Sequence, residues 1–253
     1  RYLLVLRNMK INVSFCAQEK LHELIKVSMI HSNPISPKEA NLKSSGKWIS
    51  LLSLPRYLKV NPKNPILEKP YLLSIDNLIE KWGKVFAREE KPIIGINWQG
   101  NKDIEKSDIL KGRSMPLEVF SRVVNNKCKF ISLQKGYGSE QLNKCSFIEN
   151  FAKFQDEIDD VWDFVEYTAI LKNCSLVLTT DTSIAHLSGG LGKETWLFLQ
   201  DIPDWRWGYE GNKTFWYPNM KIFRQTERDN WDELLTRVSK ELIKFLEVNH
   251  EKN

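Results

Sequence analysis

The sequence is poor in cysteine, with only four in 253 residues, and they stand far apart at Cys16, Cys128, Cys145 and Cys174. No CxxC pair and no cluster of cysteine with histidine occurs, which disfavours a zinc site or a disulfide framework. We therefore expect four reduced thiols in the core of a cytoplasmic protein.

Long hydrophobic runs are missing as well. No apolar stretch approaches the ~18 residues that a membrane-spanning helix needs, and no signal-peptide pattern is present. Lys and Arg outnumber Asp and Glu by only 37 to 32, and charges of both signs are interspersed along the chain. This balance is too weak for a nucleic-acid-binding protein, so we expect no nucleic-acid partner, but it suits a phosphorylated small molecule.

Several common enzyme motifs are absent too. The sequence has neither GxGxxG nor GxxxxGK[ST], which disfavours a dinucleotide-binding domain of the usual type and a P-loop NTPase, and it has no GxSxG or HExxH. What is present, 42% hydrophobic and 27% charged residues, is typical of a folded globular protein. The length allows one large domain or two modest ones.

Alternating apolar segments predict a parallel α/β protein in two domains, residues 1–90 and 91–253. In the first domain the patterns favour helices over 1–9 and 18–28, strands over 11–17 and 48–54, and a helix capped by Asp76. In the second, the expected strands are 92–98, 129–134, 175–180, 194–200 and 220–225, and the expected helices are 116–125, 161–172, 182–190 and 229–248. Strands that are apolar throughout require helices on both faces of the sheet.

Polar residues follow three of the expected strands in the second domain. They are Gly100 and Asn101 after the first strand, Gln134 and Lys135 at the end of the second, and Asp181, Thr182 and Ser183 after the third. Because ligands of open parallel sheets bind beyond the carboxyl ends of the strands, we expect these residues to line one cleft. For Gln134 and Lys135 the alternative is a solvated turn.

The segment after the third of these strands carries the most information. Asp181 or Thr182 is expected to cap a short helix, whose first amides can hold a phosphate or sugar hydroxyls. His186 falls in the first turns of that helix, and Gly189, Gly190 and Gly192 allow a ligand or neighbouring backbone to approach. The alternative is an ordinary capped helix with His186 as a packing residue.

Arg113 stands at the entrance of the helix expected over 116–125, with Lys111 two residues before it. A guanidinium there can clamp a diphosphate, although an exposed loop arginine is the simpler interpretation. The aromatic-rich loop 205–217 is expected to anchor itself against its own domain, and stacking on a base or sugar is the alternative.

Seven segments, taken in order, resemble the heptosyltransferase-like family 9 glycosyltransferases, particularly those attached to tetratricopeptide-repeat proteins in bacteria. They are LLSLPRYL (51–58), IGINWQGN (94–101), GRSMPLEVF (112–120), FISLQKG (130–136), LVLTTDTSIAHLSGGLGKETWLFL (176–199), PDWRWGYEG (203–211) and FWYPNMKIFRQ (215–225). The resemblance implies a GT-B architecture, in which two Rossmann-like domains with parallel sheets face each other across a cleft.

By this resemblance Asp181, Thr182, Ser183 and His186 match the family's DTxxxHL segment, which holds the donor phosphates and sugar. Arg113 stands near a basic phosphate ligand, and Gly100 and Asn101 match a glycine-containing loop. With Gln134 and Lys135 these residues form the expected donor-binding set. The last helix would pack across both domains, as it does in this architecture.

The sequence departs from the family at its start. Members have a strand and a GDxIQF-like loop ahead of the residues that match Arg1 and Tyr2, and that loop carries the acid expected as general base. We therefore expect an incomplete N-terminal domain. The resulting hypothesis is an inverting, metal-independent transferase without a cofactor, using a nucleotide sugar and a glycan, lipid or protein acceptor. The resemblance also suggests a repeat domain upstream in the full-length chain. The alternative is a non-catalytic nucleotide-sugar-binding or scaffolding module.

Overall fold

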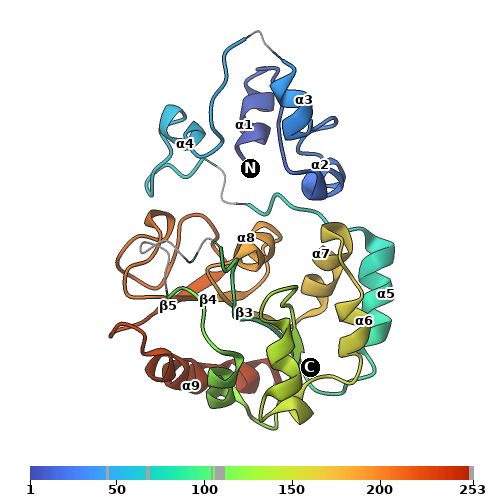
Figure 1. Cartoon of the computed structure of the whole chain (residues 1–253), viewed down its shortest axis with the longest axis vertical. Helices are drawn as coiled ribbons and strands as arrows, with labels where there is room; N and C mark the ends of the chain where they lie inside the picture. The colour runs from blue at the N-terminus through green and yellow to red at the C-terminus, as the bar shows by residue number, and fades with distance from the viewer. Residues whose placement is uncertain (44–45, 67–68, 104, 106–111, 251–253) are drawn as a thin grey trace.

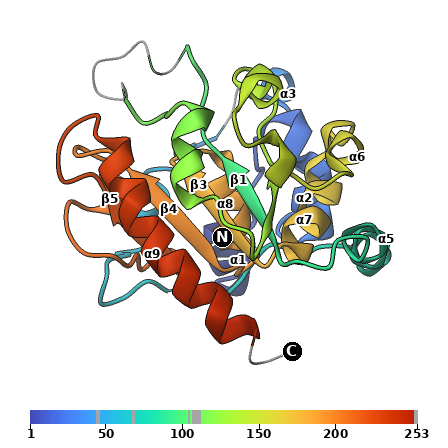
Figure 2. The same ribbon diagram turned by 90° about the horizontal axis from the view of Figure 1, so that it is seen from below.

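The computed structural model describes residues 1–43, 46–66, 69–103, 105 and 112–250. Its centre is a five-stranded parallel sheet with the strand order β2-β1-β3-β4-β5, of which Figure 2 labels β1, β3, β4 and β5. The strands are β1 (Ile93–Asn97), β2 (Lys129–Ser132), β3 (Leu176–Thr180), β4 (Thr195–Leu199) and β5 (Met220–Arg224). Each lies inside a segment expected to be a strand, so the α/β class and the parallel sheet are confirmed.

Nine α-helices occur within the described part of the chain. They are α1 (Tyr2–Asn8), α2 (His22–Val27), α3 (Pro37–Asn41), α4 (Leu54–Tyr57), α5 (Asp76–Phe86), α6 (Gln155–Asp159), α7 (Phe164–Asn173), α8 (Ser183–Gly190) and α9 (Trp231–His250). Five 3-10 helices accompany them: Glu19–Leu21, Leu117–Val123, Ser139–Lys144, Ile148–Asn150 and Trp205–Trp207. The expected helix 116–125 is thus a 3-10 helix, and Asp76 begins α5 without capping it, because the cap residue is Ile75.

The two faces of the sheet are covered by different helices, as continuous apolar strands require. On β1, Ile94 and Ile96 pack with α9 and the 3-10 helix Leu117–Val123, whereas Ile93 packs with α5 and α7 on the other face. This alternation follows from the two-residue period of a strand. Because helices cover both faces of the sheet, the carboxyl ends of the strands remain accessible to a ligand.

Helix α9 packs on one face of the sheet, and Figure 1 shows it at the end of the molecule remote from α1 and α3. Of its apolar positions, Leu234, Leu235, Val238 and Leu242 are fully buried, whereas Ile243 is 41% exposed. Its buried side chains join the cluster formed by β1, β3 and the 3-10 helix Leu117–Val123. These apolar residues of α9 are spaced three and four apart and thus lie on its buried face, except Ile243.

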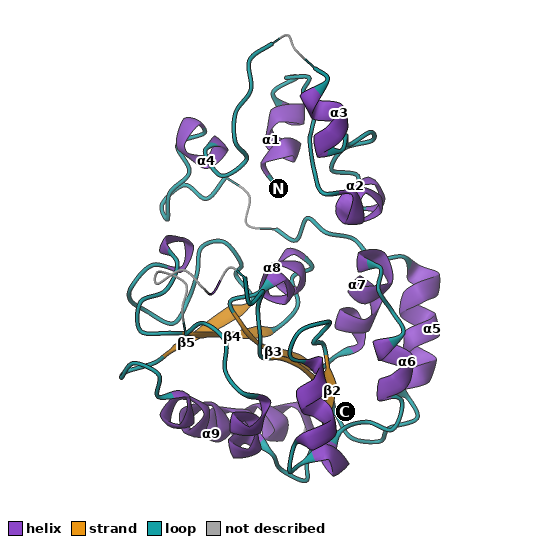
Figure 3. Cartoon of the chain, viewed as in Figure 1, coloured by secondary structure: helices purple, strands orange, loops and turns teal. Residues whose placement is uncertain are grey.

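The expected N-terminal strands are wrong. Figure 3 shows strands only in the part of the molecule that contains β1 to β5, and residues 11–17 contribute just one isolated parallel bridge, Cys16 to Ile35. Residues 48–53 form no strand, and Leu54 begins α4. Apolar composition favours a strand only where neighbouring strands complete its hydrogen bonds, and the described residues of 1–90 supply none. The described residues of 1–90 thus form no second Rossmann-like sheet.

The N-terminal part has instead a small core of six buried side chains, namely Tyr2, Leu3, Leu6, Ile25, Ile30 and Leu54. Helix α2 also contributes Leu24 to the cluster on the α5 and α7 face of the sheet. One helix thus joins the N-terminal part to the sheet.

The cysteines follow expectation with one exception. Cys128, Cys145 and Cys174 are buried and free, but Cys16 is free and exposed, because residues 11–17 do not form the expected buried strand. Burial raises the pKa of Cys128 to about 11 and that of Cys174 to about 12, so both are unreactive at neutral pH. No helix in the described ranges is long and apolar enough to cross a membrane.

Candidate functional site

A cleft of about 690 Å³ lies beyond the carboxyl ends of β1, β2 and β3. All nine residues of the expected donor-binding set line it: Gly100, Asn101, Arg113, Gln134, Lys135, Asp181, Thr182, Ser183 and His186. The structure thus brings together residues from three loops that are up to 86 positions apart in sequence. This is the convergence that a parallel sheet imposes on the loops at one edge.

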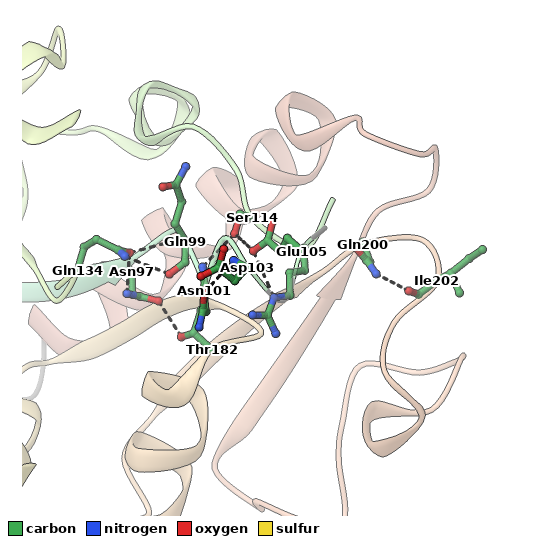
Figure 4. A network of polar contacts seen from close by, with 12 residues as sticks. Asn97, Gln99, Asn101, Asp103, Glu105, Ser114, Gln134, Thr182, Gln200 and Ile202 are labelled. Carbon is green, nitrogen blue, oxygen red and sulfur yellow. Dashed lines mark hydrogen bonds and ion pairs between the residues drawn. The ribbon is translucent and has the colours of Figure 1, made fainter. Parts of the chain in front are cut away.

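Buried amides hold the floor of the cleft in place (Figure 4). The Asn97 side chain, at the end of β1, accepts a hydrogen bond from Thr182 Oγ1 at 2.7 Å and donates one to Gln134 Oε1 at 2.8 Å. Gln134 Nε2 donates to the carbonyl oxygens of Gln99 and Tyr137, and Gln134 Oε1 accepts from the Gln99 amide. Because both ends of the Gln134 amide are engaged, this residue positions loops.

Thr182 fixes the start of α8. Its backbone is extended and its Oγ1 accepts from the Ile184 amide, which makes it the helix cap, as expected. Ser183 is the first helical residue and is exposed at the cleft. The unpaired amides of a first turn carry partial positive charge, so this end of α8 favours an anion.

Asp181, immediately before the cap, is buried. Burial raises the pKa of its carboxyl, and the nearby charges of Arg206 and Arg113 act in the opposite direction. Asp181 therefore contributes an acid whose ionisation depends on two arginines of the same cleft.

Arg113 reaches the cleft because Gly100 has no side chain. A Cβ on Gly100 would lie 2.5 Å from Arg113 Nη2, and the Gly100 amide donates to Ser114 Oγ at 2.9 Å. Arg113 Nε donates to Glu105 Oε1 at 3.3 Å, and Ser114 Oγ donates to the same oxygen. A carboxylate of the chain itself therefore pairs with this arginine, and Figure 4 shows that carboxylate, Glu105, beside Ser114. Lys111, the other basic candidate, lies outside the described residues.

His186 sits at the far side of the cleft in a defined tautomer. Arg206 Nη1 can only donate, so His186 Nε2, 3.5 Å away, is the acceptor, and Nδ1 donates to the Tyr217 hydroxyl at 2.9 Å. The ring also stacks on Trp207, with centroids 5.2 Å apart. Burial, followed by the charges of Arg206 and Arg1, lowers the pKa of His186 to about 4, so the imidazole is neutral at pH 7.

Arg206 is a cleft residue that was not expected from the sequence. This side chain lines the cleft, and Asp204 Oδ1 orients it by accepting from Arg206 Nε at 2.7 Å. The loop that carries it follows β4, which is the neighbour of β3 in the sheet. Ligands of open parallel sheets bind beyond the carboxyl ends of the strands, and this rule applies to the loop after β4 as well. The aromatic residues around Arg206 instead suggested a packed loop.

Lys135 lines the cleft, but its ammonium group is engaged elsewhere. It donates to the carbonyl oxygens of Ile158 and Asp159 at 2.6 and 2.8 Å, at the carboxyl end of α6, where a cation is favoured by the helix dipole. Burial lowers the pKa of this lysine. Its charge therefore stabilises α6 in this structure.

The glycines of α8 allow other segments of the chain to pack closely against this helix. A Cβ on Gly189 would lie 2.6 Å from the Tyr217 ring, and one on Gly190 would lie 2.6 Å from Leu72. The Gly190 carbonyl also accepts hydrogen bonds from the Tyr71 and Leu72 amides, at 2.9 and 3.0 Å. Of the two expected uses of these glycines, close approach of backbone is the one observed.

The aromatic loop is anchored to its own domain, as expected, but Trp216 also packs against the N-terminal core, and its carbonyl accepts from Arg1. Arg224 of β5 donates to four of its carbonyls, and Trp207 and Tyr217 are buried. Trp205, however, is 59% exposed, so not every ring of the loop acts as an anchor.

A second cavity, of about 680 Å³, adjoins the cleft, and we call it the chamber. It shares Gln18, Phe164, Ser183, His186 and Arg206 with the cleft. Its other walls are mostly apolar and come from α1, α2, the segment around Leu51 and the aromatic loop. The five shared residues therefore stand between a polar cleft and an apolar chamber.

The described residues contain no group of three or more His, Cys, Asp or Glu side chains that could hold a metal ion.

Comparison with known proteins gives matches in structure alone. No family model and no curated protein sequence matches the chain. It is similar to the ADP-heptose LPS heptosyltransferase II of E. coli, with a TM-score of 0.48 and 11% identity over 73% of this chain and 56% of that one. It is also similar to a family 9 glycosyl transferase of Veillonella parvula, with a TM-score of 0.48 and 11% identity over 99% of this chain and 78% of that one. The wall teichoic acid polymerase TagF gives a TM-score of 0.35 and 15% identity over 74% of this chain and 45% of that one.

Proposed function

We propose that the cleft binds the diphosphate of a nucleotide sugar and that the protein transfers the sugar to an acceptor. The observation that carries the proposal is the pairing of two arginines, Arg113 and Arg206, with the amino-terminal end of α8 at one polar cleft. Guanidinium groups and helix amides are the groups that proteins use to hold a diphosphate. The family resemblance of the DTxxxHL segment points to the same ligand.

In this proposal the leaving group is stabilised electrostatically, without a metal ion. Arg113, Arg206 and the first amides of α8 would neutralise the charge that develops on the departing nucleoside diphosphate. Neutral His186, held by Tyr217 and Arg206, would meet the sugar at the boundary between cleft and chamber. The acceptor hydroxyl would attack the anomeric carbon from the chamber side with inversion as the bond to the nucleoside diphosphate breaks, and its proton would pass to a general base. The close approach of the two substrates would supply part of the rate enhancement.

One observation favours the second candidate, a nucleotide-sugar-binding module without turnover. The described residues of 1–90 that line the cleft or the chamber include no Asp or Glu. Glu39 is engaged in the cap of α3, Asp76 lies in α5, and Glu68 is outside the described residues. A general base from this part of the chain is commonly worth about 10²- to 10⁴-fold in rate, so its loss would leave binding with little transfer.

A panel of nucleotide sugars tests the proposal. We expect one nucleotide sugar to bind at one site per chain, with equal affinity in the presence and absence of a chelator. Release of nucleoside diphosphate, measured at saturating donor, separates the two candidates: turnover supports the transferase, and binding without turnover supports the module. Absence of binding across the whole panel, or binding that the chelator abolishes, would contradict the proposal.

A further inference from the structure

The segment 46–57, which we call the exposed segment, leaves many large apolar side chains in water. Trp48 is 89% exposed, Leu52 66% and Tyr57 72%, and Ile49 and Leu51 are also exposed. Single exposed apolar residues are common on proteins, but five within ten residues are characteristic of an interaction surface. The N-terminal core uses only Leu54 of the exposed segment as a buried residue.

The charge around the exposed segment is of one sign. From residue 40 to residue 67 the sequence has five Lys and Arg and no Asp or Glu. Over residues 1–75 the count is twelve against four, whereas residues 76–253 carry 25 against 28. The modest overall charge therefore conceals a basic N-terminal part joined to a slightly acidic remainder.

The position of the exposed segment suits contact with a large surface. It leads to α4 at the end of the molecule that lies opposite α9 (Figure 1). Leu51, Leu52 and Pro55 also line the chamber, so the exposed segment forms part of the chamber wall. A surface docked here would adjoin the chamber and would lie away from the helix layer of α9.

We infer that the exposed segment docks the protein on an anionic membrane surface. Lys47 and Arg56 complement anionic lipid headgroups, and Trp48 and Tyr57 are the residue types that prefer the membrane interface. Leu51 and Leu52 add apolar area that can enter the boundary between headgroups and acyl chains. A nucleic acid would be attracted by the charge alone and would gain nothing from the aliphatic side chains. The inference does not depend on the proposed function.

Sedimentation of the full chain with vesicles tests the inference. We expect binding to vesicles of phosphatidylcholine mixed with phosphatidylglycerol. Binding to vesicles of phosphatidylcholine alone should be weaker by a factor of about ten or more. Two variants separate the contributions: Trp48→Ser with Leu52→Ser removes apolar area, and Lys47→Glu with Arg56→Glu reverses charge. Each should lower binding by about tenfold or more, and high salt should reproduce the effect of the charge variant. All four side chains are exposed, so the melting temperature should not change.

The matched control is Ile243→Ser with Lys240→Glu, an exposed apolar and basic pair on α9 at the other end of the molecule. It should bind anionic vesicles as the unmodified protein does. The inference is wrong if the unmodified chain does not bind anionic vesicles or binds vesicles of both compositions equally. It is also wrong if the control variant lowers vesicle binding as much as the two test variants do. A concentration-dependent dimer that Trp48→Ser with Leu52→Ser abolishes, in a protein that does not bind vesicles, would assign the exposed segment to contact between copies.

Discussion

At the scale of single residues, the cleft contains side chains that hold the loops and side chains that remain available to a ligand. Position after a strand predicted that Gln134, Lys135 and Arg113 would line the cleft, and they do. It could not predict that the Gln134 amide is engaged by Asn97 and Gln99, because those partners come from another segment. It also missed Arg206, whose orientation depends on Asp204.

Arg113 and Glu105 give the first prediction. If a phosphate takes the place of the Glu105 carboxylate on Arg113, Glu105→Gln should tighten binding of nucleoside diphosphate several-fold, and Arg113→Ala should weaken it. Hydrogen bonds to charged groups contribute about 1.5–3 kcal/mol, so the weakening should be about tenfold or more. Equilibrium titration of both variants measures the effect. Weaker binding by Glu105→Gln would show instead that Glu105 orients Arg113 for the ligand.

The lowered pKa of His186 predicts how the free energy of unfolding depends on pH. Below about pH 6.5 the unfolded chain takes up a proton that folded His186, with its pKa of about 4, does not accept. Stability should therefore fall as the pH drops from 6.5 towards 4, by at most about 3 kcal/mol from this group. His186→Gln should flatten the fall when urea unfolding is compared across this range. Parallel curves for variant and unmodified protein would contradict the assignment.

At the scale of elements, strands of the sheet were predictable and the N-terminal strands were not. The five apolar segments beyond residue 90 each have a neighbour in the sheet, so composition and pairing agree. The segment 48–54 has a strand-like composition, but no neighbouring strand pairs with it in the described structure. Composition reports what a residue prefers when it is buried, and cannot supply the partner that buries it.

Two tryptophans of the aromatic loop, Trp205 and Trp207, allow a comparison of a buried and an exposed ring in the same short helix. Trp207 is 3% exposed and stacks on His186, whereas Trp205, two residues earlier, is 59% exposed. Trp207→Ala should lower the free energy of unfolding by about 3–5 kcal/mol. Trp205→Ala should change it by less than about 0.5 kcal/mol, as exposed substitutions usually do. Urea denaturation of both variants measures the difference, and equal losses would mean that the loop packs differently.

At the scale of the whole molecule, the cleft and the chamber meet where the sheet domain adjoins the N-terminal part. The order of the family-like segments predicted the polar cleft, because five of the seven supply loops at one edge of the sheet. It did not predict the chamber, because its walls depend on how α1, α2 and residues 70–72 pack against α8 and the aromatic loop. Such packing joins segments far apart in sequence and leaves no local pattern to find.

Calorimetric titration of nucleoside diphosphates tests the central claim, that this cleft binds the donor, most directly. The unmodified protein should bind one of them with a stoichiometry of one, and Arg206→Gln should weaken that binding about tenfold or more while the melting temperature stays within a few degrees. The control is Arg122→Gln, which removes an arginine paired with Asp232 on the surface and should bind as the unmodified protein does. Equal affinity in the Arg206→Gln and unmodified proteins would contradict the account.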